Sequence, residues 1–153
     1  MTWAGTYPAA VAGLVTAWQR AYPLQGVELR NGPQLTNPQA QEVLTAAYTS
    51  LEDDTAADGE WTPEGLAGVP DREQYTIACA VSVLNGDGDV VAARARVFAL
   101  AAAAGDAIAA DATLGGAVMN AWMGSWTVRE DAADPGMVAT VRFGVRIDAY
   151  TNR

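Results

Sequence analysis

The chain contains no histidine and no lysine, and all nine of its cationic side chains are arginines. Without histidine there is no imidazole general base, no Ser/His/Asp triad and no common zinc site. Without lysine there is neither a phosphate-binding P-loop nor a Schiff-base amine. The remaining possibilities are chemistry carried by carboxylates, or a protein that has no catalytic site.

Positive charge is also scarce, because nine arginines stand among 18 acidic residues and give a net charge of −9. Nucleic-acid binding depends on clustered basic groups that neutralise phosphates. Here the arginines are scattered along the whole chain. We therefore expect no tight, sequence-reading binding of DNA.

A single cysteine, Cys79, excludes an internal disulfide. It lies in an apolar, strand-like run, which favours a small buried hydrophobe over a reactive thiol. The uncharged stretches at 1–19 and 112–128 are broken by polar residues, proline or glycine, and the first lacks a basic flank. We expect neither a signal peptide nor a spanning helix, no membrane partner, and a soluble, unexported protein.

The length of 153 residues and a hydrophobic content of 50% predict one globular domain over residues 1–153. Apolar residues at three- and four-residue spacing predict a helix at 7–22, which Pro23 stops. An alanine-rich helix is predicted at 90–110, with Asp89 as its N-cap. We expect its packing side to carry Val90, Val91, Arg94, Val97, Phe98, Ala101 and Ile108.

Alternating or apolar runs predict strands at 27–30, 75–84, 117–129 and 137–151, with a loop at 34–41. Residues 42–51 fit either a helix or a strand, and we favour the strand. The order predicts an α+β fold: a largely antiparallel four- to five-stranded sheet, two helices packed on one face, and a long C-terminal β-hairpin. One face of that hairpin is apolar and the other largely polar.

Residues 52–73 hold eight of the 18 acids and are predicted to form a long, flexible, exposed loop. Trp61 within it needs a surface to cover, either on its own domain or on another subunit. Residues 85–89 resemble the start of a calcium loop. Val90 and Arg96 stand where that motif requires glycine and glutamate, so a turn and a helix cap are favoured.

Two groups of residues are candidates for a functional site. A carboxylate pair could serve glycoside hydrolysis or bind a cation, but it needs a rigid support, and the acids concerned lie on the predicted loop (Glu52, Asp53, Asp54, Asp58 and Glu60). We therefore predict no catalytic residues, no metal and no cofactor.

Trp122 and Trp126 are four residues apart on a predicted strand, so we expect them to share one face. Such a pair could form a sugar-stacking platform in a small carbohydrate-binding module. Beside Arg142 and Arg146 of the next strand it could equally form a protein interface. A simple core or rim role for the tryptophans is the third possibility.

The order of these features resembles the tail terminator, or tail completion, proteins of long-tailed phages of actinobacteria. The resemblance rests on the first helix, the acidic middle segment and five short runs, which are 31–33, 75–81, 85–87, 94–98 and 111–116, together with the closing strand at 136–143. It implies a hexameric ring that caps the tail tube, ends tube growth and meets the head connector.

The resemblance further implies a structural virion protein of the tail neck, assembled in the host cytoplasm, with no enzymatic activity. Its partners would be copies of itself, the tail-tube protein and a head-tail connector or stopper protein, while genomic DNA passes through without specific binding. The acidic balance fits such a conduit, since a negative wall repels phosphates. This hypothesis predicts carboxylates, not arginines, at the lumen.

The predicted subunit contact joins an arginine face to the acidic segment of the next copy, which would close head-to-tail into a ring. The residues involved are Arg129, Arg142, Arg146, Trp122 and Trp126 on one side, and Asp53, Asp54, Asp58 and Trp61 on the other. Three alternatives stay open: another connector or minor tail subunit, a carbohydrate-binding module, and a histidine-free carboxylate hydrolase.

Overall fold

The computed structural model describes residues 5–33, 41–66, 69–133 and 136–151. Within these ranges, two α-helices, one 3₁₀ helix and six strands follow one another along the chain. In order they are α1 (Tyr7–Arg20), η1 (Tyr22–Leu24), β1 (Glu28–Asn31), β2 (Glu42–Ala46), β3 (Ala57–Thr62), β4 (Arg72–Asn85), α2 (Val90–Ala110), β5 (Asn120–Ala133) and β6 (Gly136–Tyr150).

These six strands form one sheet with the order β1-β2-β4-β6-β5. β3 lies beside β2 along the same edge of β4: β2 pairs with residues 79–83 of β4 and β3 pairs with residues 72–77. Among the described strands, the β1–β2 pair is parallel and the other pairs are antiparallel. The predicted α+β class and the long C-terminal hairpin are confirmed, with one strand more than expected.

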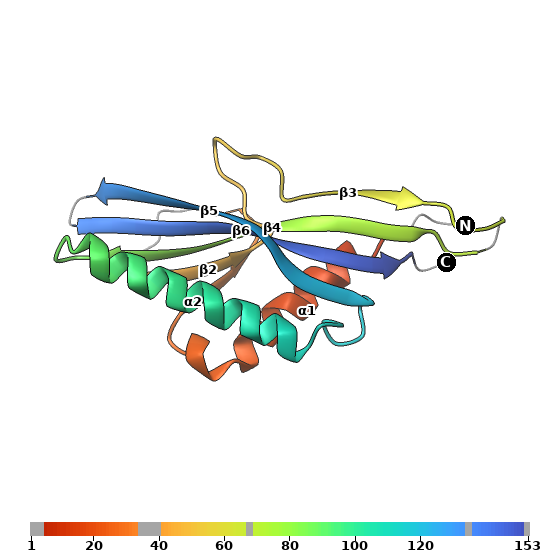
Figure 1. Cartoon of the computed structure of the whole chain (residues 1–153), viewed down its shortest axis with the longest axis horizontal. Coiled ribbons are helices and arrows are strands. Elements are labelled where there is room, and N and C mark those ends of the chain that lie inside the picture. Colours follow the sequence, from red (N-terminus) through yellow and green to blue (C-terminus); the bar gives the residue numbers. More distant parts are fainter. Residues whose placement is uncertain (1–4, 34–40, 67–68, 134–135, 152–153) are drawn as a thin grey trace.

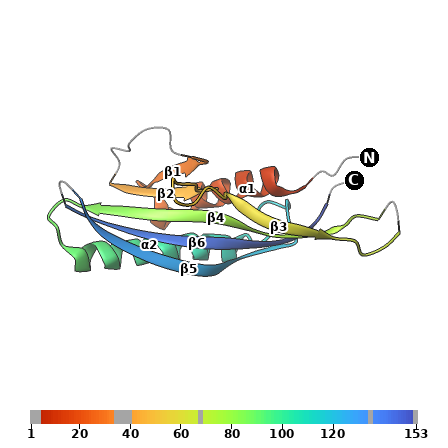
Figure 2. The ribbon, with the colours of Figure 1, turned by 90° about the horizontal axis from the view of Figure 1, so that it is seen from above.

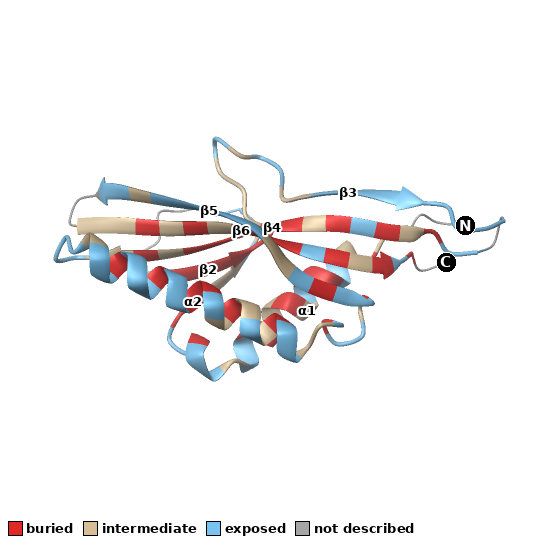
Figure 3. Cartoon of the chain, viewed as in Figure 1, coloured by how far each residue is buried: buried red, intermediate tan, exposed pale blue. Residues whose placement is uncertain are grey.

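Both helices cover the same face of the sheet, as predicted (Figures 1 and 2). Trp18 of α1 is fully buried, and its indole Nε1 donates to the carbonyl of Ala104 in α2 over 3.3 Å. The Trp18 ring also meets the Phe143 ring of β6 edge-on, with centroids 6.3 Å apart. The core therefore lies between the helices and the central strands β4 and β6, where the buried residues gather (Figure 3).

The helix boundaries match the sequence prediction closely. α2 spans Val90–Ala110, and the Asp89 carboxylate caps it by accepting from the Ala92 N–H over 3.1 Å. Its packing side matches the prediction at Val97, Ala101 and Ile108. It differs at Val91, Arg94 and Phe98, which are exposed. The buried positions are Ala93, Val97, Leu100, Ala101, Ala104 and Ile108. Alanines on this side let the helix lie close to the sheet, which the larger side chains would prevent.

The predicted loop at 52–73 contains strand β3, so that part of the prediction is wrong. β4 runs for 14 residues, and the half beyond β2 needs a partner for its backbone groups. Gly59 permits the pairing, because a Cβ there would lie 2.2 Å from the Cβ of Tyr75. Asp58 and Glu60 stay exposed in this strand, so their charge does not oppose its formation.

The strands predicted at 27–30 and 42–51 correspond to β1 and β2. The loop predicted at 34–41 lies, except for Gln41, outside the described residues. Within the described ranges, no helix is both long enough and apolar enough to cross a membrane.

Candidate interaction surface

The side of the sheet opposite the two helices, here called the open face, carries the polar residues of β4 and β6. Two shallow hollows of about 420 Å³ each lie on it. One is lined in part by Asp58, Trp122 and Arg146. The other is lined in part by Asp53 and Arg142. The open face thus brings together several of the residues that the sequence singled out.

Arg142 forms an ion pair with Asp53 of the same chain. The guanidinium carbon of Arg142 also lies 5.7 Å from the centre of the Tyr48 ring. The segment between β2 and β3 is held over the open face in this way, and the Tyr48 N–H donates to the carbonyl of Ala78 over 2.7 Å. The arginine–aspartate contact that the sequence predicts between subunits is therefore formed within one chain. Its use between subunits remains a prediction.

Arg129 is similarly engaged within the chain. One of its terminal nitrogens lies 3.0 Å from the Glu52 carboxylate, and its Nε lies 2.9 Å from Asp131. The Asp131 charge and then the Glu52 charge raise the pKa of the Arg129 guanidinium. All three side chains are more than half exposed, so water screens these pairs strongly.

Trp122 and Trp126 point to opposite faces of the sheet, contrary to the prediction. Trp122 stands beside Arg146 on the open face, whereas Trp126 stands beside Phe143, whose side chain faces the helices. A β-bulge between Met123 and Trp126 adds a residue and shifts the alternation. The Trp126 ring meets the Phe98 ring of α2 edge-on, with centroids 5.4 Å apart. The two rings form no shared sugar-stacking platform, so the carbohydrate-binding alternative loses its structural basis.

Three of the predicted site residues, Asp54, Asp58 and Arg146, have side chains that form no hydrogen bond or ion pair within the described part of the chain. The same holds for Glu60, which precedes Trp61 in β3. All four side chains belong to exposed residues. These charged groups remain available to another molecule.

Trp61 packs back on its own domain, which was one of the two possibilities for it. Its Nε1 donates to the Glu73 carboxylate over 2.5 Å, although half of Trp61 remains exposed. Glu73 is only 4% exposed and also accepts from the backbone N–H and the hydroxyl of Thr6, over 2.8 and 2.5 Å. This buried carboxylate attaches the start of α1 to β3 and β4.

Tyr75 joins the hydrogen-bonded cluster that Thr6 and Trp61 form around Glu73. The sequence analysis did not predict this cluster. The hydroxyl proton of Thr6 goes to Glu73, so the Tyr75 hydroxyl donates to the Thr6 oxygen at 2.8 Å. Burial is the main cause that raises the pKa of Tyr75 to about 12. The sequence does contain a pattern that predicts the burial of Glu73. Glu73, Tyr75 and Ile77 alternate along the strand, which places Glu73 on its apolar face.

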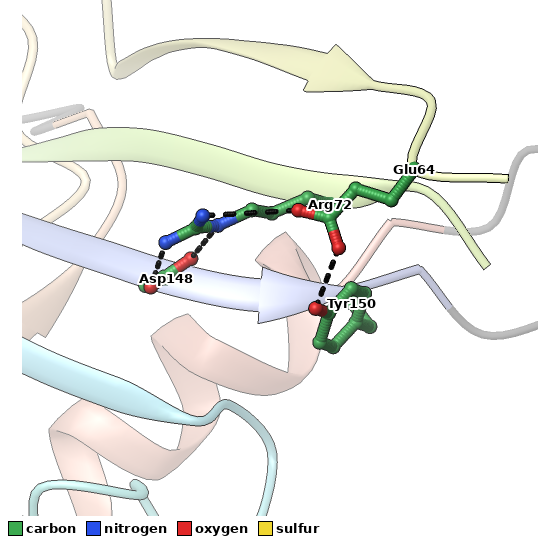
Figure 4. A network of polar contacts seen from close by, with 4 residues as sticks. All are labelled: Glu64, Arg72, Asp148 and Tyr150. Atoms are coloured by element: carbon green, nitrogen blue, oxygen red, sulfur yellow. Dashed lines mark hydrogen bonds and ion pairs between the residues drawn. The ribbon is translucent and has the colours of Figure 1, made fainter.

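A second polar network joins the first residue of β4 to the C-terminal end of β6 (Figure 4). The Arg72 guanidinium donates twice to Asp148, over 3.0 and 2.9 Å, and these bonds lower the pKa of the Asp148 carboxyl. Glu64 lies 3.7 Å from Arg72 and accepts from the Tyr150 hydroxyl over 2.7 Å. The network is structural, since it ties three segments together at one end of the sheet.

The acids of 52–60 do not form a catalytic pair in the structure. Glu52 and Asp53 contact different arginines, while Asp58 and Glu60 belong to a strand that pairs with β4. Within the described ranges, no three or more acidic or cysteine side chains are grouped to hold a metal ion. Asn85 confirms the predicted turn, because its side-chain oxygen accepts from the N–H groups of Asp87 and Asp89.

No protein-family model and no curated protein matches the sequence. Among solved structures, a chain of the virion of a native gene transfer agent (GTA) particle is similar, with a TM-score of 0.54. The likeness covers 95% of this chain and 98% of that chain, at 10% sequence identity. At this identity the comparison shows a shared fold.

Proposed function

We propose that this protein is a structural subunit of a phage-like virion, and more specifically a tail terminator. The observation that carries the proposal is the likeness to a chain of a GTA virion over nearly the full length of both chains. The order of elements and short runs that resembles tail terminators of actinobacterial phages supports the finer assignment. In this role the chain forms a hexameric ring on the head-proximal end of the tail tube, ends tube growth and joins the tube to the head connector.

The molecule is suited to work by shape and contact. Its sheet has one face covered by helices and one open face, and acidic and basic side chains without partners among the described residues stand on the surface. Such a subunit needs contact surfaces and no active site, so we propose that it is not an enzyme. Its partners are then copies of itself, the tail-tube protein and a connector or stopper protein.

Measuring the native mass of the purified chain, alone and with tail-tube protein, tests this function. We expect a species of six times the subunit mass of 15.9 kDa, at least when tube protein is present. In the same samples, added terminator is expected to stop tube elongation, as seen in the length distribution of the tubes. A single copy that neither associates nor binds tubes would contradict the proposal.

Another connector or minor tail subunit of the same particle would share this fold and these surfaces. The assignments differ in the neighbour that the ring binds, because only a terminator must cap the tail-tube protein. Association with the connector and none with tube protein would favour this second assignment.

A further inference from the structure

We propose that the ring contact joins the two opposite edges of the sheet, so that the β3 edge of one copy packs on the β5 edge of the next. The acidic edge is formed by Asp58, Glu60 and Trp61 of β3. The aromatic edge is formed by Phe98, Trp126 and Val128, flanked by Arg94 and Arg129. This inference rests on the proposed function and names the partner surface within it.

The aromatic edge is an exposed apolar patch at the end of the sheet. Trp126 is 58% exposed, Val128 39% and Phe98 36%, and the rings of Phe98 and Trp126 are in contact. β5 is an edge strand of the sheet and is 14 residues long. A long edge strand with exposed apolar side chains is a surface on which another chain tends to pack.

Basic groups with spare hydrogen-bond donors flank this patch. Arg94 binds Glu130 through its Nε and one terminal nitrogen, and Arg129 binds Glu52 and Asp131 through its Nε and one terminal nitrogen. A guanidinium group has five N–H donors, so one terminal nitrogen of each arginine is unused within the described chain. Each can donate to a further carboxylate from outside.

The acidic edge offers the matching groups. Asp58 and Glu60 are exposed, and their side chains form no hydrogen bond or ion pair with any described residue. Trp61 is 50% exposed while its indole nitrogen is anchored on Glu73, so an apolar ring is held at the surface in a defined orientation. An anchored tryptophan flanked by carboxylates complements an apolar patch flanked by guanidinium groups.

The two edges also agree in the faces on which these groups lie. Asp58 pairs with Thr76 and Arg129 pairs with Thr140, which places both charged residues on the open face. Trp61 pairs with Glu73 and Trp126 pairs with Phe143, which places both aromatic residues on the helix-covered face. When two copies lie side by side with their open faces turned the same way, the acidic side chains of β3 therefore meet Arg129. On the other face, the Trp61 ring meets the Trp126 ring.

A second copy of this chain is the occupant that these features favour, because one chain carries both complementary surfaces on opposite edges. Contacts between two different patches of identical subunits are heterologous, and they close into a ring when the rotation between copies permits it. Arg142 belongs to β6, which lies between β4 and β5, so it is not on an edge strand of the sheet.

Complementary variants test the contact in the full-length protein. The variant Asp58→Arg/Glu60→Arg reverses the acidic edge, and the variant Trp126→Glu charges the aromatic edge. Under conditions where the unmodified chain forms rings, we expect each variant alone to sediment as a single copy, with association weakened at least tenfold. An equimolar mixture is expected to form a two-chain species and nothing larger, because only one intact acidic edge can meet one intact aromatic edge.

Matched controls carry the same changes on other surfaces. Asp87→Arg/Asp106→Arg makes an equal change of charge at two exposed acids, and Tyr22→Glu places a charge at an exposed aromatic residue outside both edges. Both controls are expected to form rings, and Val128→Lys is expected to behave like Trp126→Glu. Rings formed by either edge variant, or a mixture that stays entirely monomeric, would overturn the inference while leaving the ring function intact. Failure of the unmodified chain to assemble, alone or on tubes, would instead overturn the proposed function.

Discussion

Individual residues in the interior show how burial sets the chemistry of the few titratable groups there. Cys79 is 1% exposed, which confirms the prediction of a small buried hydrophobe, and burial raises the pKa of its thiol to about 12. Tyr75 is also buried, and the pKa of its phenol is raised to about 12. Both groups therefore stay protonated in the folded chain at pH values where an unfolded chain loses the protons.

This difference predicts a loss of stability at alkaline pH. In the unfolded chain Cys79 and Tyr75 ionise near their ordinary pKa values of 9.0 and 10.0, below the folded values of about 12. Their contribution is therefore complete below about pH 9 and is lost as the pH rises toward 12, by up to about 1.4 kcal/mol per pH unit for each group. Urea unfolding from about pH 8 to about pH 11 measures this slope.

Variants at the same positions separate the two contributions. Tyr75→Phe and Cys79→Ala are each expected to flatten part of the alkaline slope, even if each also lowers the overall free energy of unfolding. A thiol that reacts with a disulfide reagent at about pH 8 as fast in the folded chain as in urea would show that Cys79 is accessible and contradict this explanation.

At the scale of the elements, the pairing of β3 with β4 depends on Gly59. A side chain at position 59 would bring a Cβ within 2.2 Å of the Tyr75 Cβ and 2.5 Å of the Gln74 carbonyl oxygen. Backbone and Cβ atoms cannot move aside cheaply, so β3 would have to separate from β4. Trp61 would then lose its position on Glu73.

Gly59→Ala is accordingly expected to lower the free energy of unfolding by about 1–3 kcal/mol. It should also increase amide hydrogen exchange in residues 57–62 relative to β6. Gly86→Ala is the matched control, because a Cβ at position 86 would meet nothing within 4 Å. Equal stability of the two variants would show that the close approach of β3 and β4 is not required.

At the scale of the whole molecule, the net charge of −9 opposes contact with nucleic acid. We expect no binding of linear duplex DNA at low salt, where electrostatic attraction to phosphates is strongest. Fluorescence anisotropy of a labelled duplex, with the chain titrated at a series of salt concentrations, measures this. Salt-sensitive binding would contradict the proposal that DNA passes a ring of this protein without sticking.

Much of the element order could be predicted from local patterns. The apolar periodicity of α1, the Asp89 cap of α2, and the alternation in β4 and β6 are properties of neighbouring residues, so they are visible without the fold. The buried state of Cys79 follows from the same alternation. The absence of histidine and lysine likewise excludes whole classes of active site through composition alone, because the side chains that carry those chemistries are missing.

Tertiary structure alone decided the features that depend on partners distant in sequence. β3 forms because β4 extends beyond β2, and the Glu73 carboxylate is buried because Thr6 and Trp61 both donate to it. The bulge in β5 sends Trp122 and Trp126 to opposite faces, which a simple count of residues cannot show. Local sequence sets which conformations each segment favours, whereas the pairing of distant segments determines which surfaces are left exposed for other molecules.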